Sequence, residues 1–340
     1  MPMSSLPKFQ QQLLPKIESG LKASFEGHDF SHTPNLREML AYHLGWSAEE
    51  GMGYHGKRIR PLITLLVTGA LSAPIDVALP AALAVEFLHN FTLIHDDIED
   101  KSTLRHSRPT LWCKWGIPQA INAGDALFTI AQIAMLDLIK TTNQSIANQA
   151  MMQLNRVCLQ LTQGQHLDIA FETETEIEIS AYLQMISGKT AALVALSAFL
   201  GGLVAHQRPI ELALLSDFGT NLGLAFQIQD DYLGIWGDTE KIGKSTAGDI
   251  SSRKKTLPIL FGLNNCLEFR EAWQKPDPSL QDIANMADTL SNCGAQTYTQ
   301  SQSQYYTNKA FEALTHLFYQ KNNDAIALIE LTETLLHRNA

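Results

Sequence analysis

Helical periodicity dominates this sequence and constrains its fold more than any other feature. Apolar residues recur three and four positions apart over long segments, whereas the alternation typical of β-strands is almost absent. We predict helices over residues 7–21, 60–71, 80–100, 118–141, 144–172, 179–205, 211–236 and 255–267, and in two segments after Pro278. The pattern therefore predicts an all-α fold, a bundle of about ten or more helices.

Length and composition favour one globular domain. The chain has 340 residues, of which 45% are hydrophobic and 18% charged, so it can bury a sizeable core. No internal repeat or long linker divides it, and we expect a single domain over residues 1–340. The net charge of −10 argues against a nucleic-acid partner. It does not argue against phosphorylated substrates, because bound metal ions reverse the local sign of a carboxylate site.

The cysteines and the apolar segments indicate the compartment. The four cysteines form no CxxC pair, so neither a zinc site nor a disulfide framework is indicated. Residues 1–12 lack the basic and apolar regions of a secretion signal. The longest apolar run, residues 191–205, is short for a membrane span and contains two glycines. We therefore expect a cytoplasmic protein without a transmembrane segment.

An acidic cluster ends the apolar helix predicted for residues 80–100. Residues four apart share a helix face, so Asp96 and Asp100 point the same way, and Asp97 lies about 100° round. Clustered carboxylates repel one another, and the C-terminal end of a helix disfavours negative charge. A divalent cation such as Mg²⁺ removes both problems. The alternative is an ordinary solvated acidic helix end.

A second acidic pair, Asp230 and Asp231, also follows an apolar helical segment. The position four residues after Asp230 is Gly234, so this pair lacks a second carboxylate one turn away. One such pair is weak evidence for a metal site. Two pairs that each end a buried helix are much harder to explain by chance, and we expect them to face each other across the bundle.

Basic residues flank both acidic clusters. The segment Gly-Lys-Arg-Ile-Arg-Pro at 56–61 places three cations in four positions, a pattern suited to anion binding, although a plain basic loop would look the same. Further basic residues are Arg105, His106, Arg108, Lys189, Lys244, Arg253, Lys254 and Lys255. Such alternation of acids and bases suits a diphosphate that metals hold on one side and Lys and Arg on the other.

In this order the motifs resemble those of the trans-isoprenyl diphosphate synthases, also called polyprenyl synthetases. The resemblance runs from about Gly56 to Leu260. It rests on GKRxRP at 56–61, DDxxD at 96–100, Gly-Gln at 164–165, Lys-Thr at 189–190 and FQxxDD at 226–231. It implies an all-α isoprenoid synthase fold with a deep central cavity, usually in a homodimer. It also implies transfer between isopentenyl diphosphate and allylic prenyl diphosphates.

The resemblance assigns a role to each candidate residue. Asp96 and Asp100 would bind two Mg²⁺ ions with support from Asp97, and Asp230 would bind a third beside Asp231. Arg105, Lys189 and Lys244 would hold the allylic diphosphate, and Lys254 would close the site. Lys57, Arg60 and His89 would bind isopentenyl diphosphate. Thr190 and Gln227 would stabilise the allylic cation with their dipoles.

Two departures and one product determinant stand out against the family pattern. His106 replaces a second arginine that contacts isopentenyl diphosphate, unless Arg108 substitutes for it, and Gly234 replaces the last acid of the second motif. A large residue five places before the first motif limits product length in this family. Here that residue is Phe91, about 7–8 Å along the helix from Asp96, with Leu88 one turn deeper. We predict a geranylgeranyl product, with farnesyl next.

Several alternatives stay open. A longer-chain synthase would share the motifs. A class I terpene cyclase shares DDxxD but lacks the basic isopentenyl diphosphate site. A non-catalytic partner subunit would usually lose the acidic motifs. His95-Asp96 also spells the HD pair of metal-dependent phosphohydrolases, a class that needs further His and Asp ligands, such as His55 and His89.

Overall fold

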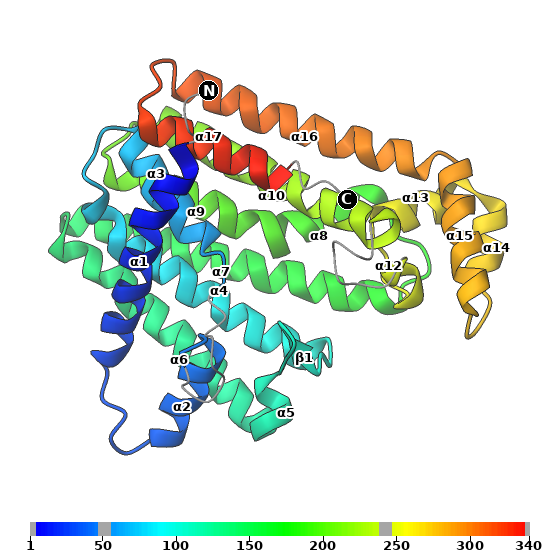
Figure 1. The fold of residues 1–340 in the computed structure, drawn as a ribbon, viewed down its shortest axis with the longest axis horizontal. Helices are drawn as coiled ribbons and strands as arrows, with labels where there is room; N and C mark the ends of the chain where they lie inside the picture. Colours follow the sequence, from blue (N-terminus) through cyan, green and yellow to red (C-terminus); the bar gives the residue numbers. More distant parts are fainter. Residues whose placement is uncertain (1–4, 47–55, 238–246, 337–340) are drawn as a thin grey trace. The chain divides into compact units, whose positions relative to one another are not determined.

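The all-α prediction is confirmed by a computed structural model, which describes residues 5–46, 56–237 and 247–336 (Figure 1). The α-helices are α1 (Ser5–Glu26), α2 (Pro34–His43), α3 (Ile59–Ala70), α4 (Leu79–Glu99), α5 (Leu111–Trp115), α6 (Ile117–Leu136), α7 (Gln144–Thr173), α8 (Ile179–Ile186), α9 (Ala192–Val204), α10 (Pro209–Trp236), α12 (Gly248–Ser251), α13 (Leu257–Asn265), α14 (Leu267–Trp273), α15 (Leu280–Asn292), α16 (Ala295–Leu317) and α17 (Asn323–Leu336). Short 3₁₀ turns are η2 (Ile75–Ala78) and η3 (Asp137–Lys140), and η4 (Ser187–Ala191) is a π-turn.

The sequence prediction missed some elements. It omitted the short helices α2, α5, α12 and α14, and it placed two helices after Pro278 where the structure has three. A small antiparallel hairpin joins β1 (Leu104–Arg105) to β2 (Arg108–Pro109), with Leu104 opposite Pro109. Its turn residues His106 and Ser107 both have positive φ, a backbone choice that apolar periodicity does not report.

The described residues form two compact units. One unit comprises those within Met1–Leu159, Leu196–Ser216 and Phe318–Glu330, and the other comprises those within Gln160–Ala195, Asp217–Leu317 and Leu331–Ala340. The expectation of one domain stays a prediction, and each unit is described by itself.

Helix α4 forms the centre of the first unit. It packs against α6, α3 and α1 (Figure 1). Its residues 81–88 are all buried, so the apolar half of α4 is a core helix that carries the acidic cluster at its far end. Gly201 allows a close approach to α3, because an added Cβ would lie only 2.6 Å from the carbonyl oxygen of Thr64. The hydroxyl of Thr64 donates across this contact to the carbonyl of Ser197 at 2.9 Å.

The second unit packs the end of α10 against α8, η4 and α13. Tyr182, Ile228, Leu257 and Leu260 share one buried cluster. An added Cβ at Gly223 would lie 2.5 Å from the Cα of Ala191, so this glycine lets α10 pass close to the π-turn. This close packing brings the segment around Thr190 to the segment around Gln227.

Three helical stretches among the described residues are long and apolar enough to cross a membrane. They are Ile75–Glu99, Ile117–Thr141 and Ile179–Val204, and the last contains most of the apolar run noted in the sequence. Of their apolar windows, 61%, 44% and 67% respectively is buried inside the protein. Packing against other helices thus accounts for much of this apolarity, and the expected lack of a transmembrane segment stays a prediction.

Candidate functional site

The first acidic cluster lies where the prediction placed it, on the last turn of α4. The backbone N–H of Asp100 donates to the carbonyl of Asp96 at 2.8 Å, so the helical turn continues through the cluster. Asp96 is partly buried and Asp100 is exposed, whereas Asp97 is only 3% exposed. Adjacent acids on a helix point in different directions, and here one of them points inward.

Asp97 forms an ion pair with Arg105 of the hairpin. The Nε of Arg105 lies 3.0 Å from both carboxylate oxygens of Asp97, and one terminal nitrogen lies 2.9 Å from Oδ1. Burial raises the pKa of Asp97, and the hydrogen bonds from Arg105 oppose that rise. The pair fixes the hairpin beside the acidic helix end, so Arg105 lies at the same end of α4 as Asp96 and Asp100.

The other hairpin cations differ in their surroundings. The Arg108 guanidinium lies 4.0 Å from the ring centroid of Tyr42 and donates to the carbonyl of that residue at 3.1 Å. Arg108 therefore anchors the hairpin to α2, which argues against its substituting for the arginine that His106 replaces. Burial, followed by the charge of Arg105, lowers the pKa of His106.

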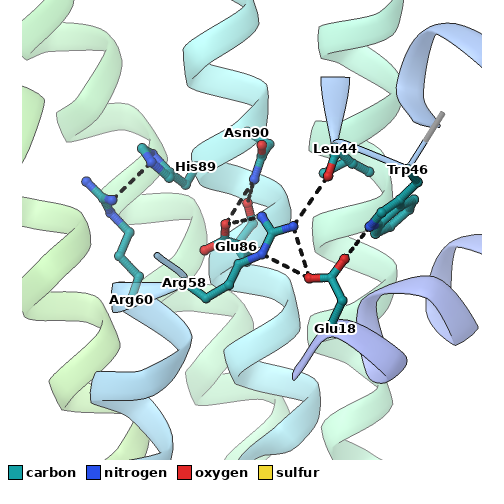
Figure 2. Close-up of polar contacts among 8 residues, drawn as sticks. All are labelled: Glu18, Leu44, Trp46, Arg58, Arg60, Glu86, His89 and Asn90. Carbon is teal, nitrogen blue, oxygen red and sulfur yellow. Dashed lines mark hydrogen bonds and ion pairs between the residues drawn. The ribbon is translucent and has the colours of Figure 1, made fainter. Parts of the chain in front are cut away.

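The basic segment at the start of α3 separates into exposed and buried cations. Lys57 is exposed, Arg60 is partly buried and Arg58 is only 5% exposed. Arg60 meets His89 of α4, with Nη1 and Nε2 3.0 Å apart (Figure 2). Burial and then the charge of Arg60 lower the pKa of His89 well below its usual value, so the imidazole is neutral. The structure thus pairs two residues, 29 positions apart, that the sequence assigned to one anion site.

The second acidic pair also has one inward residue. Asp230 is partly buried, whereas Asp231 is only 3% exposed. Asp231 accepts hydrogen bonds from the Tyr182 hydroxyl, from Nε2 of Gln227 at 3.1 Å and from the backbone N–H of Leu257 at 3.1 Å. Burial raises the pKa of Asp231 to about 6, against the opposing effect of these donors. Asp231 is therefore held by the protein itself.

Gln227 links this buried acid to Thr190. The Thr190 hydroxyl donates to the side-chain oxygen of Gln227 at 2.9 Å, while the amide nitrogen of Gln227 donates to Asp231. The amide orientation is thereby defined from both ends. The two residues that the sequence assigned to cation stabilisation are in direct contact, with their dipoles fixed.

Asp249 is a residue that the sequence reasoning missed. An added Cβ at Gly234 would collide with the Asp249 carboxylate. An acid from α12 therefore lies beside the position of the second motif where a carboxylate was expected. No spacing rule connects residues 234 and 249, because they belong to two different helices, α10 and α12.

The π-turn η4 carries Lys189, which forms an ion pair with Asp168 of α7. Gly164, one turn before Asp168, lies against the backbone of Lys189 and Gly188, where an added Cβ would collide. This close contact explains why the Gly-Gln motif begins with glycine. Asp168 lies four residues after Gly164 and so on the same face of α7, a spacing that could have predicted its position near Lys189. Single π-turns between α-helical segments, such as η4, are common at functional sites.

The three basic residues after α12 differ in their exposure and in their hydrogen-bond partners. Arg253 donates to the carbonyl of Trp273 at 2.5 Å, and Lys255 donates to carbonyls at the end of α7, including that of Phe171 at 2.6 Å. Lys254 is the exposed cation of this segment, and its positive charge acts on the buried Asp231. Its exposure leaves it accessible to an anionic ligand. Lys244 lies outside the described residues.

The candidate length-determining residues differ in burial. Leu88 is fully buried in the core, whereas Phe91 is partly buried. The Phe91 ring lies 5.2 Å from that of Phe128 on α6 and 4.8 Å from the ring of His95. The Nε2 of His95 lies 3.4 Å from the Ile121 carbonyl of α6, which argues against its acting as an HD-type metal ligand.

Asp96 and Asp100 fit a hard cation such as Mg²⁺. They offer carboxylate oxygens one turn apart, and Mg²⁺ takes one or two carboxylates and completes its shell with waters and phosphates. Among the described residues, no three His, Cys, Asp or Glu side chains gather into a preformed metal site. The donor set therefore suits a metal that arrives with a phosphorylated ligand.

Comparison with known proteins connects these features to one family. The sequence model of the family described as Polyprenyl synthetase matches residues 43–289, which include all five motifs. The chain is 41% identical over 232 residues to a (2E,6E)-farnesyl diphosphate synthase of Mycobacterium tuberculosis, a match that covers 67% of this chain and 63% of that relative. It is 32% identical over 341 residues to a geranylgeranyl diphosphate synthase of Sulfolobus acidocaldarius, with 99% of each chain covered.

A solved structure extends the similarity to the fold. The crystal structure of geranylgeranyl pyrophosphate synthetase from Pyrococcus horikoshii has a TM-score of 0.88 to this chain at 29% identity. The match covers 98% of this chain and 99% of that one.

Proposed function

Because the chain belongs to the polyprenyl synthetase family, we propose that it is a short-chain prenyltransferase. It joins isopentenyl diphosphate to allylic diphosphates of five, ten or fifteen carbons and releases pyrophosphate. Geranylgeranyl diphosphate is the proposed end product. The relatives named above are geranylgeranyl and farnesyl diphosphate synthases, which supports a product in this size range.

The observation that carries this proposal is the arrangement at the end of α4. Asp96 and Asp100 lie one helical turn apart, and the Asp97–Arg105 pair places a guanidinium beside them. Carboxylates for a metal and an arginine for a phosphate thus occupy the same helix end, which is the chemistry that a diphosphate leaving group needs.

We assign the metal ligands as follows. Asp96 and Asp100 hold two Mg²⁺ ions and Asp230 holds a third, while Asp97 and Asp231 support their neighbours from buried positions. When bound, Mg²⁺ neutralises the charge that develops on the departing diphosphate.

The protein residues supply the remaining electrostatics. Arg105, Lys189 and Lys244 hold the allylic diphosphate as its C–O bond breaks, and Lys254 closes over it. Thr190 and Gln227, whose dipoles are fixed by hydrogen bonding, stabilise the allylic cation. The isopentenyl double bond attacks this cation to form the new C–C bond. The proton then lost passes to the departing diphosphate.

The second substrate binds at the start of α3. Lys57, Arg60 and His89 hold the diphosphate of isopentenyl diphosphate, and the neutral His89 donates or accepts a hydrogen bond without adding charge. His106 lies where the family has an arginine, so the contact at this position is weaker than in relatives that carry both arginines.

We further propose a cytoplasmic homodimer. Exposed apolar side chains gather on α6 and α7, in the unit that also holds the first acidic cluster: Ile117, Ile121, Ile133, Leu136, Met152 and Leu159. Where exposed apolar side chains form a contiguous patch, they mark an association site. Light scattering of the purified protein tests the assembly.

A product assay tests the reaction itself. Labelled isopentenyl diphosphate is incubated with the protein, Mg²⁺ and each allylic primer, and chain length is read by chromatography. Geranylgeranyl diphosphate is expected, and EDTA should stop its formation. A farnesyl or longer product would revise the end product alone. A cyclic hydrocarbon formed without isopentenyl diphosphate would overturn the proposal.

A further inference from the structure

Arg58, in the middle of the basic segment, points away from its basic neighbours. Its backbone is left-handed, with φ 47° and ψ 38°, and it caps the start of α3. Figure 2 shows its side chain and that of Arg60 leaving this turn in different directions. Because of this backbone conformation the two side chains point in different directions: Arg60 toward His89, and Arg58 into the protein interior.

Two carboxylates accept hydrogen bonds from the Arg58 guanidinium, that of the buried Glu86 and that of the partly buried Glu18. Nη1 donates to Glu86 at 2.7 Å, and Nε donates to Glu18 at 3.2 Å. Glu18 also accepts from the indole N–H of Trp46, and Glu86 accepts from the amide of Asn90 at 3.2 Å. Glu86 is only 4% exposed, so these protein donors take the place of water around its carboxylate.

Glu86 lies close to the proposed isopentenyl diphosphate site. It precedes His89 by three residues on α4, so the two side chains share a face of the helix. His89 in turn contacts Arg60 at 3.0 Å, and Glu86 is the acid whose negative charge acts on Arg60. If Arg58 did not bind Glu86, the carboxylate of Glu86 could therefore pair with Arg60.

Arg60 itself is poorly neutralised. Within the described residues its guanidinium contacts the neutral His89, and its buried Nε has no hydrogen-bond partner there. A guanidinium in this state retains its charge and donors for an anion. A carboxylate that turned toward Arg60 would compete directly with a diphosphate.

We propose that Arg58 is a positioning residue that withholds Glu86 from Arg60 and so keeps Arg60 available to isopentenyl diphosphate. The inference rests on the proposed function, because it concerns the same substrate. Arg58 does not touch the substrate in this scheme. It acts by occupying Glu86, the buried acid of α4 whose charge acts on the substrate-binding Arg60.

Calorimetric titration with isopentenyl diphosphate tests this inference on the full chain. Arg58→Met should weaken binding by about tenfold or more, the usual worth of one charge-assisted hydrogen bond. In the double variant Arg58→Met/Glu86→Gln the competing charge is absent, and binding should recover most of that loss. In kinetic assays, Arg58→Met should raise KM for isopentenyl diphosphate and leave KM for the allylic primer unchanged.

A purely structural role predicts a different result. The double variant would then bind as weakly as Arg58→Met, and that outcome would overturn the inference. Melting curves establish that each variant is folded, and Arg58→Gln with Arg58→Gln/Glu86→Gln replaces the pair if methionine prevents folding. Arg208→Met, at an exposed ion pair with Glu211, is the matched control and should bind normally. No binding by the unaltered protein would overturn the proposed function itself.

Discussion

The carboxylate of Asp249 occupies the space beside Gly234 in which any larger side chain at that position would begin. Gly234 lies in α10 and Asp249 in the short helix α12, so the missing side chain is what allows the two helices to approach. The glycine that departs from the family motif is thus matched to an acid elsewhere in the chain.

Gly234→Ala should therefore destabilise the protein. Alanine favours a helix interior over glycine by about 1 kcal/mol, but overpacking costs about 1–3 kcal/mol, and Asp249 is too short to swing far aside. We expect a net loss in the free energy of unfolding, measured by urea denaturation. Gly234→Ala/Asp249→Ala should regain it, because the colliding atoms are gone. Gly56→Ala, where an added Cβ meets nothing within 4 Å, is the control. Equal stability of Gly234→Ala and the unaltered protein would contradict this packing.

The acids on the last turn of α4 should be essential for turnover and dispensable for folding. Asp100 is exposed and Asp96 only partly buried, so neither supports the core. Asp96→Ala or Asp100→Ala should lower kcat by about 100-fold or more, the scale of losing a main electrostatic contributor. Circular dichroism should still report a helical protein. Glu99→Ala, from the same helix end but outside the DDxxD acids, should retain activity. Full turnover by either aspartate variant would argue against a metal at this place.

Sequence patterns predicted which residues share a helix face but could not identify their partners. The periodicity placed Asp96 and Asp100 together, and the motif order named Arg60, His89, Thr190 and Gln227, which the structure joins in two contacting pairs. Asp97 and Asp231 were expected beside metals, yet both are buried against protein donors. Which of two adjacent acids turns inward depends on the neighbouring elements, here a hairpin and α8, and no local pattern encodes these. The left-handed Arg58 is a similar case, because its direction follows from one backbone angle.

Phe91 should set the length of the product. Its ring contacts that of Phe128 at a tilted angle and also contacts His95, so its removal opens space on the side of α4 that faces α6. Phe91→Ala should shift the product to longer chains at similar consumption of isopentenyl diphosphate, as chromatography of the dephosphorylated prenols would show. Phe311→Ala, a partly buried phenylalanine on α16, should leave chain length unchanged. An unchanged product from Phe91→Ala would mean that another side chain forms the floor.

The hydrogen bonds to Asp282 at the start of α15 should make the protein less stable at acid pH. Asp282 accepts hydrogen bonds from Lys275 at 2.7 Å, from the Ser279 hydroxyl at 2.6 Å and from the backbone N–H of Ser279 at 2.8 Å, and these donors lower its pKa from 3.8 to about 2. Because the folded-state pKa lies below the ordinary value, the carboxylate stabilises the fold above about pH 4, and this contribution disappears as the pH falls through 2. Asp282→Ala should therefore lower Tm at pH 7, and its difference from the unaltered protein should shrink steadily on acidification. Asp288→Ala, at an exposed acid on the same helix but outside the cap, is the matched control. A gap for Asp282→Ala that is equally large at pH 7 and pH 2 would show that helix propensity, and not the charged cap, is responsible.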